Sequence, residues 1–181
     1  MGLDRETSLE ELAAIVSQAL ERAGIRATLS GGAAVSMYTD NEYQSYDLDF
    51  VSSERNTIIA KAIEPLGFRY QAGMREFRHP DTDYYVEFPS GPLSFGETVV
   101  PDADAAKLQT VFGPIRIVTP TQSVMDRLAP YVTWNDNQAF DQAVMIARRH
   151  SLDWSALQEW AEREGMDPKV IDRLRKRAGA D

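Results

Sequence analysis

The stretch LSGGAAVSMYTDNEYQSYDLDFV, residues 29–51, carries the strongest structural pattern in the chain. A short, partly β-branched run over residues 25–29 leads directly into Gly31 and Gly32, and small residues compatible with a helix follow. This order predicts a strand, a glycine turn and a helix.

The end of the same stretch, YDLDFV at residues 46–51, alternates well enough to predict a half-buried strand. Side chains alternate between the two faces of a strand, so Asp47 and Asp49 are expected on the same face. Two carboxylates at that separation repel each other unless water or a cation neutralises them. The pair could be a solvated outer face. It also suits Mg²⁺ or Mn²⁺, because hard divalent cations prefer oxygen ligands.

The two glycines favour the metal interpretation over the solvated face. Placed between a strand and a helix N-terminus, Gly31 and Gly32 allow backbone amides to approach a phosphate closely, and the helix dipole adds a favourable potential. A phosphate cradle beside a pair of metal-binding carboxylates describes a site for a nucleoside triphosphate.

A third carboxylate is expected, because two-metal phosphoryl transfer needs a group that holds or deprotonates the acceptor hydroxyl. Glu87 is the candidate, as an acid within the otherwise apolar segment YYVEF, residues 84–88. The competing interpretation is an ordinary exposed glutamate. Asp81 and Asp83 are nearby alternatives, but the sequence PDTD is better explained as a turn.

The remaining patterns predict an α+β fold with a mixed sheet flanked by helices and a C-terminal helical subdomain. Residues 1–118 are expected to form the α/β core and residues 119–181 the helical subdomain packed on it. Three tryptophans beside the C-terminal helices are predicted to be packing anchors: Trp134, Trp154 and Trp160.

The individual elements follow from local patterns. Helices are predicted over residues 8–23, over 53–64 with Ser53 as cap, and throughout after Pro120. Two hairpins are predicted, one pairing residues 75–79 with 84–88 and one pairing 108–112 with 115–119.

Composition limits the classes of function. The chain of 181 residues has no cysteine, which excludes disulfides and thiolate metal sites and makes a cytoplasmic location the default. It lacks a signal-peptide pattern and any long apolar run, so no membrane association is expected. The net charge of −9 disfavours binding to a polyanion, except through a basic run over residues 169–177, which is better explained as complementing a helix dipole.

Taken together, the motifs resemble those of the nucleotidyltransferase superfamily, whose fold is that of the polymerase β catalytic domain. The shared elements are Gly31-Gly32, the pair Asp47 and Asp49, and a later acid on a strand, Glu87. The closer likeness is to minimal nucleotidyltransferases related to the AbiEii type of toxin, which carry a motif like SYDLDF, residues 45–50, and a later Thr-Pro leading into helices.

The resemblance implies roles for individual residues. It implies that Asp47, Asp49 and Glu87 are the catalytic and metal-binding triad. The residues implied to bind the nucleotide are Ser30, Gly31, Gly32, Ser45 and Arg127. Two positions depart from the pattern of relatives: Gln44 stands where an arginine is common, and Arg127 where a lysine is common. Loss of a cation weakens nucleotide binding, whereas Arg127 can act as a longer, bidentate phosphate partner.

The leading hypothesis is a magnesium-dependent nucleotidyltransferase that moves a nucleoside monophosphate from a nucleoside triphosphate to a hydroxyl acceptor on a protein, a tRNA or a small molecule. The alternative belongs to another class: a protein that keeps the fold, turns over weakly and acts as a regulatory, toxin–antitoxin-type protein partner. A toxin that modifies tRNA ends is a third hypothesis, and it requires the C-terminal basic helix to line the cleft.

Overall fold

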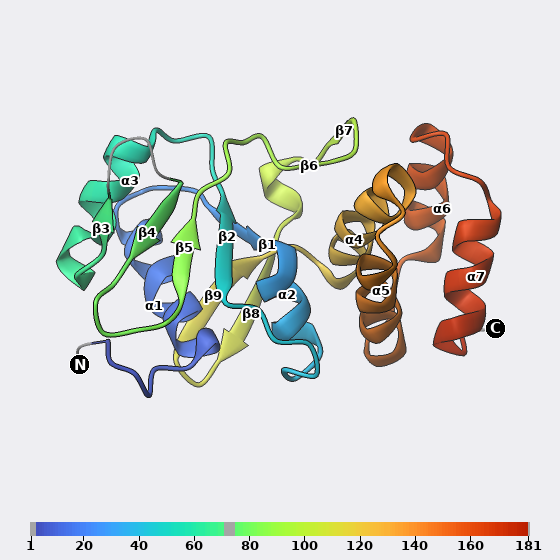
Figure 1. Cartoon of the computed structure of the whole chain (residues 1–181). Coiled ribbons are helices and arrows are strands. Elements are labelled where there is room, and N and C mark those ends of the chain that lie inside the picture. Colours follow the sequence, from blue (N-terminus) through green and yellow to red (C-terminus); the bar gives the residue numbers. More distant parts are fainter. Residues whose placement is uncertain (1–2, 71–74, 181) are drawn as a thin grey trace.

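The computed structural model describes residues 3–70 and 75–180 and has a mixed seven-stranded sheet flanked by helices (Figure 1). The strand order is β3-β4-β5-β2-β1-β9-β8. These strands are β1 (Thr28–Ser30), β2 (Asp47–Val51), β3 (Arg69–Tyr70), β4 (Glu76–Arg78), β5 (Tyr85–Glu87), β8 (Ala106–Thr110) and β9 (Gly113–Ile117). β1 pairs antiparallel with β2 and parallel with β9, and β2 pairs parallel with β5. The predicted α+β class is confirmed.

The two faces of the sheet differ in burial. α1 (Leu9–Arg22) packs against β9 and against α3 (Asn56–Ile63), and Figure 1 shows α1 behind the strands. Along β2, Leu48 and Phe50 are fully buried in the core, whereas Asp47 and Asp49, which alternate with them, are half-buried. The alternation predicted for this strand therefore places its carboxylates on the more accessible face.

The C-terminal helical region lies at one end of the sheet, next to α2 (Gly31–Tyr38), which contacts β2, α4 and α5. Its first helix begins with a complete capping box, in which Thr119 and Gln122 satisfy each other's backbone amides. The four helices are α4 (Pro120–Trp134), α5 (Asn137–Arg149), α6 (Trp154–Arg163) and α7 (Lys169–Ala178). The division into domains at residue 118 stays a prediction.

A small hairpin connects the sheet to these helices. It is formed by β6 (Ser94–Phe95) and β7 (Thr98–Val99), which pair with each other outside the main sheet. The buried indole of Trp160 donates a hydrogen bond to the Phe95 carbonyl at 3.1 Å. Glu164, just after α6, accepts bonds from the Glu97 amide at 2.9 Å and the Thr98 hydroxyl at 2.5 Å. Hydrogen bonds from Trp160 and to Glu164 therefore hold the hairpin against α6.

Loss of the Trp160 hydrogen bond is expected to lower the stability of the protein. Trp160→Phe removes the donor to the Phe95 carbonyl and leaves a small void, so the free energy of unfolding should fall by about 1–3 kcal/mol. Trp134→Phe is the matched control, because Trp134 is 77% exposed, and it should change stability by less than about 0.5 kcal/mol. Urea denaturation of both variants tests this; equal stability of the two would contradict it.

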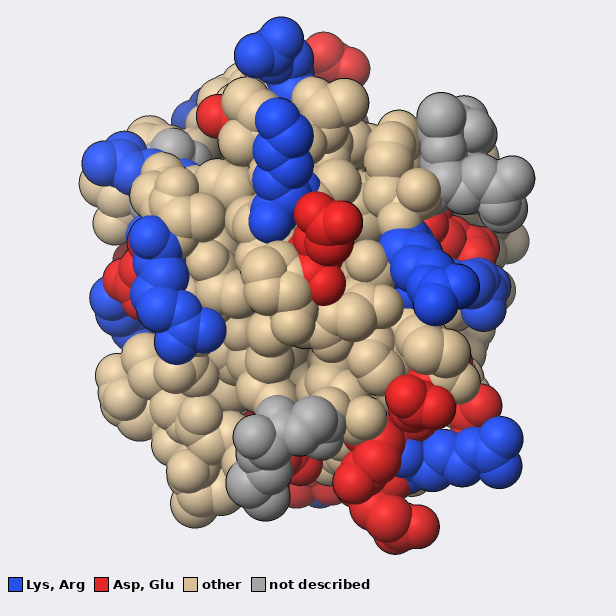
Figure 2. Space-filling model, turned by 90° about the vertical axis from the view of Figure 1, so that its left-hand side faces the viewer, with Lys and Arg blue, Asp and Glu red and all other residues tan. Residues whose placement is uncertain are grey.

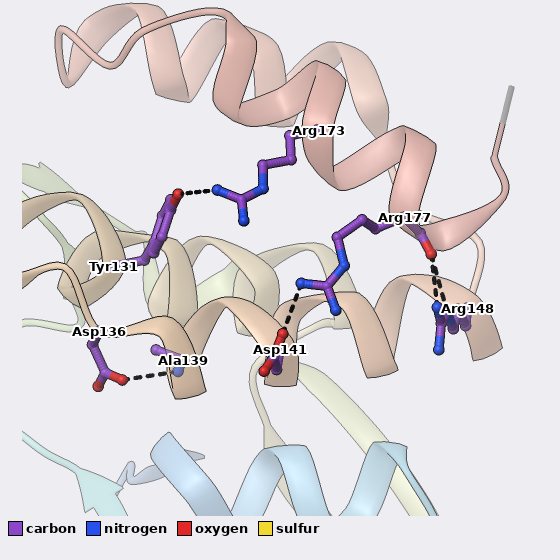
Figure 3. Close-up of polar contacts among 7 residues, drawn as sticks. All are labelled: Tyr131, Asp136, Ala139, Asp141, Arg148, Arg173 and Arg177. Carbon is purple, nitrogen blue, oxygen red and sulfur yellow. Dashed lines mark hydrogen bonds and ion pairs between the residues drawn. The ribbon is translucent and has the colours of Figure 1, made fainter.

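Exposed arginines of α7 contact residues of α4 and α5 (Figure 3). Arg173 donates to the Tyr131 hydroxyl at 2.8 Å and lies over the Phe140 ring at 4.9 Å from its centroid. Arg177 forms an ion pair with Asp141 at 2.8 Å. These side chains hold α7 against α4 and α5, in agreement with a structural role for the basic run.

Several boundaries differ from the sequence prediction for local reasons. The first strand begins at Thr28 rather than at residue 25, because the Ile25 amide still donates to the Leu20 carbonyl of α1. Ser53 does not cap α3: Ser52 bridges to Ser90, which extends β2, and the helix begins only at Asn56.

The later elements show two further differences. The turn of the last hairpin is Val111-Phe112, because Thr110 pairs with Gly113, so Gly113 and its neighbouring proline lie inside β9. Trp134 is not a packing anchor, since it is the last residue of α4 and mostly exposed, whereas Trp160 is fully buried. Of the helices in residues 3–70 and 75–180, none is long and apolar enough to cross a membrane.

Candidate active site

The strand register brings the predicted carboxylates together. Ser30 of β1 pairs with Asp49 of β2, and Asp49 pairs with Glu87 of β5. Residues paired on adjacent strands share a face and are separated by about 4.8 Å, so these three form a row across the sheet. Asp47 lies on the same face of β2 and pairs with Tyr85. The triad predicted from sequence therefore occupies neighbouring positions on the accessible face.

Gly31 and Gly32 begin α2 directly beside this row. Gly31 has a positive φ of +64°, and a Cβ there would lie 2.4 Å from Asp49 Oδ2. At Gly32 a Cβ would lie 2.7 Å from Ser45 Oγ. Both glycines are thus needed so that acidic and hydroxyl side chains can lie against the start of the helix. From the sequence, the two glycines were expected to let a phosphate approach the backbone. In the structure, the side chains of Asp49 and Ser45 also lie close to these glycines.

Ser45 connects the aspartate strand to α2. Its hydroxyl donates to Asp47 Oδ1 at 2.5 Å, and its backbone amide donates to Ser36 Oγ at 3.0 Å. The Ser36 hydroxyl in turn donates to the Gly32 carbonyl at 3.2 Å. Ser45 therefore fixes the orientation of Asp47 relative to the glycine turn.

A fourth carboxylate, Asp126 of α4, reaches the same place. Its Oδ2 accepts the Gly31 amide at 3.0 Å and the Arg127 guanidinium at 2.8 Å. Asp126 is not among the site residues predicted from the sequence, although its neighbour Arg127 is. The contact spans 95 positions of sequence, and no short motif signals it.

Arg127 lies beside the site but is engaged with protein groups. Its Nη2 binds Asp126, and its Nη1 donates to Gln142 Oε1 of α5 at 3.4 Å. Its Nε is buried and has no partner within the residues that the structure describes. Arg127 is still near enough to Asp49 for its charge to lower the pKa of that carboxyl.

The surroundings of Asp49 disfavour its ionised form. Burial, followed by repulsion from Asp47, Glu87 and Asp126, raises its pKa from 3.8 to about 7, and Arg127 only partly opposes this. The pKa of Glu87 is also raised, first by burial and then by Asp47 and Glu76. Among the residues that the structure describes, none forms an ion pair within 4.0 Å with the side chain of Asp47, Asp49 or Glu87.

These side chains fit a magnesium ion that shares its coordination with water and substrate. No group of three or more His, Cys, Asp and Glu residues in the described part of the chain can hold a metal by itself. Magnesium commonly uses one or two carboxylates and takes its other ligands from water and phosphate oxygens. Asp47 and Asp49 supply two such carboxylates, and the charge of Arg127 only partly offsets the repulsion that raises the pKa of Asp49.

Similarity to known proteins is found in structure and not in sequence. Neither the models of known protein families nor the curated proteins gave a match to the sequence. Among solved structures, an antigenic nucleotidyltransferase-like protein from Paracoccidioides brasiliensis is similar over 93% of this chain and 94% of its own, with a TM-score of 0.59 and 13% identity. The chain has a nucleotidyltransferase-like fold.

Two structures of the antibiotic-resistance factor ANT(2'')-Ia share this fold. The solution structure covers 93% of this chain and 89% of its own, with a TM-score of 0.54 and 13% identity. The crystal structure, a complex with adenylyl-2''-tobramycin, covers 93% and 97%, with a TM-score of 0.53 and 15% identity. The nucleotidyltransferase-like part of the predicted resemblance is confirmed, and the narrower likeness to AbiEii-type proteins stays a prediction.

Proposed function

We propose that this protein is a magnesium-dependent nucleotidyltransferase that transfers a nucleoside monophosphate from a nucleoside triphosphate to a hydroxyl acceptor. One observation carries the proposal: Asp47 and Asp49 share a face of β2, and Asp49 lies against Gly31 at the start of α2. Among the described residues, no basic side chain forms an ion pair with either aspartate. A site of this charge attracts a divalent cation together with the anionic substrate that the cation binds.

The start of α2 would bind the triphosphate. The first amides of a helix have no intrahelical acceptor and carry the positive end of its dipole. Gly31 already donates to Asp126, so the amides that follow it in the first turn are those left for phosphate oxygens. Ser30, which precedes the helix without a side-chain capping bond, keeps its hydroxyl available beside them.

The acidic row would perform the transfer. Asp47 and Asp49 would hold Mg²⁺ or Mn²⁺, and the ion when bound neutralises charge that develops on the phosphoryl oxygens. Glu87, whose raised pKa makes it a better base, would take the proton of the acceptor hydroxyl. The acceptor oxygen then forms a bond to the α-phosphorus, the bond to the bridging oxygen breaks, and pyrophosphate leaves with that electron pair.

Three observations favour a small-molecule acceptor over tRNA. The face in Figure 2, on the side of the molecule away from the C-terminal helices, carries basic and acidic side chains side by side, without a continuous basic area. Arg173 and Arg177 of the basic helix are bound to Tyr131 and Asp141. The structure of ANT(2'')-Ia with adenylyl-2''-tobramycin gives the same fold with a nucleotidylated small molecule.

A second candidate function is a binding protein of weak turnover that regulates a protein partner. It is favoured by the contacts of α4: the Asp126 carboxylate occupies the Gly31 amide, and Arg127 is tied to Asp126 and Gln142 rather than left for a phosphate. A protein that retained the fold for binding alone would tolerate such an occupied cradle.

Calorimetric titration with each of the four ribonucleoside triphosphates, with and without Mg²⁺, separates the two candidates. The transferase predicts binding that requires Mg²⁺ and is lost by about a hundredfold in Asp47→Asn. Asp81→Asn and Asp83→Asn remove equivalent charges from the exposed turn and should bind like the parent protein. If no triphosphate binds, the transferase is wrong, and co-purification of a stoichiometric protein partner would favour the second candidate.

A further inference from the structure

A hollow of about 390 Å³ adjoins the acidic row on the side away from α2. Its lining residues are Asn56, Arg75, Glu87, Phe88, Pro89 and Ser90. Glu87 belongs both to this lining and to the row that contains Asp49. An acceptor seated in the hollow would therefore contact the carboxylate proposed as the base.

Arg75 supplies the basic group of this hollow. Arg78 is neutralised by Glu76, which accepts its Nε at 2.7 Å. Arg75 makes no hydrogen bond or ion pair within residues 3–70 and 75–180, and it lines the hollow together with Glu87. The Arg75 guanidinium therefore has hydrogen-bond donors left for a ligand in the hollow.

The other lining groups fit a compact polar ligand. The Asn56 amide and the Ser90 hydroxyl offer neutral donors and acceptors, while Phe88 and Pro89 supply apolar surface. The volume lies at the small end of the range for ligand sites, about 300–1,000 Å³. A guanidinium recognises carboxylate and phosphate through two parallel hydrogen bonds.

We propose that this hollow is the acceptor site and that it takes a small hydroxyl compound bearing a phosphate or carboxylate, held by Arg75 with its hydroxyl directed at Glu87. The inference rests on the proposed nucleotidyltransferase function and specifies the acceptor class. A polycation is disfavoured because Arg75 repels it, and a nucleic-acid chain is disfavoured by the size of the hollow.

Matched probes test the charge requirement. Ribose 5-phosphate and ribose differ in one phosphate, and binding of each is measured by NMR titration without nucleotide. Ribose 5-phosphate should bind about tenfold or more tightly than ribose, and Arg75→Gln should abolish that difference. Arg22→Gln is the control, because it makes the same change at an exposed position on α1 and should bind like the parent protein.

Transfer is then followed as pyrophosphate release with the preferred triphosphate and Mg²⁺. Ribose 5-phosphate should stimulate release more than ribose or the polycation tobramycin, and Arg75→Gln should reduce that stimulation about tenfold. Equal binding of the two sugars, an unaffected Arg75→Gln variant, or a preference for tobramycin would each overturn the inference.

The outcomes also separate this inference from the function on which it rests. If triphosphate binding needs Mg²⁺ and Asp47 but the sugar phosphate is not favoured, the transferase stands and the acceptor class is wrong. If no triphosphate binds while ribose 5-phosphate binding still depends on Arg75, the transferase is wrong and the hollow remains an anion site.

Discussion

Asp49→Asn is expected to abolish nucleotidyl transfer while making the folded protein more stable above pH 7. The substitution removes a metal-binding carboxylate, and the rate of transfer should fall by about a thousandfold or more, ~4 kcal/mol in the transition-state barrier. The same substitution removes a buried charge that Asp47, Glu87 and Asp126 repel. Loss of activity together with gain of stability would mark Asp49 as an acid retained for function.

The sign of the stability change follows from the pKa. In the folded protein the pKa of Asp49 is raised to about 7 from its ordinary value of 3.8. Between these two values the folded state binds more protons than the unfolded state, so the parent protein loses stability as pH rises from about 4 to about 7. Asn cannot ionise. The gain for the variant should therefore be small near pH 4 and reach on the order of 2–4 kcal/mol at pH 8.

Urea denaturation of parent and variant at pH 5, 6, 7 and 8 measures this difference. Added Mg²⁺ should stabilise the parent at pH 8 by neutralising the same charge and should have little effect on the variant. Asp81→Asn, in the exposed turn, is the control and should change neither activity nor the pH dependence. A variant that transfers like the parent, or a stability difference that does not grow with pH, would contradict the assignment.

The parts of the site that could be predicted from sequence are those set by local chemistry. The turn at Gly31 and the shared face of Asp47 and Asp49 follow from glycine conformation and from strand alternation, which operate over a few residues. The alternation that buries Val86 also placed Glu87 on a strand with an accessible face. Each of these features is contained in one short segment.

The parts that could not be predicted depend on how distant segments pack. Asp126 meets Gly31 only because α4 lies against α2, and Asn56 at the start of α3 joins Glu87 in the lining of one hollow although 31 positions separate them. Likewise, the delayed start of β1 results from the bond of Ile25 to the end of the preceding helix. The periodicity of a segment shows which of its faces is buried but not which segment covers it.

Gly31→Ala is expected to damage both stability and nucleotide binding. The positive φ of +64° costs an alanine about 1–2 kcal/mol. The new Cβ would also lie 2.4 Å from Asp49 Oδ2, so the carboxylate or the start of α2 must move. Because that contact sets the position of Asp49 relative to the first amides of α2, Mg²⁺-dependent affinity for the triphosphate should fall by about tenfold or more.

Gly24→Ala separates backbone strain from the clash. Gly24 has a φ of +73°, close to that of Gly31, but a Cβ there meets nothing within 4 Å. Its stability loss should therefore equal the strain alone, and its triphosphate affinity, measured by the same calorimetric titration, should match the parent. The excess loss in Gly31→Ala is then the cost of displacing Asp49.

The double variant Gly31→Ala/Asp49→Gly completes the test, because it removes the group that the new Cβ would strike. If the clash is the cause, the effects on stability will not add: Gly31→Ala will cost less in the Asp49→Gly background than in the parent, by the excess over Gly24→Ala. Additive effects would mean that the glycine is required only for its backbone conformation. The close approach of Asp49 to the helix would then not be the reason that Gly31 stands at the start of α2.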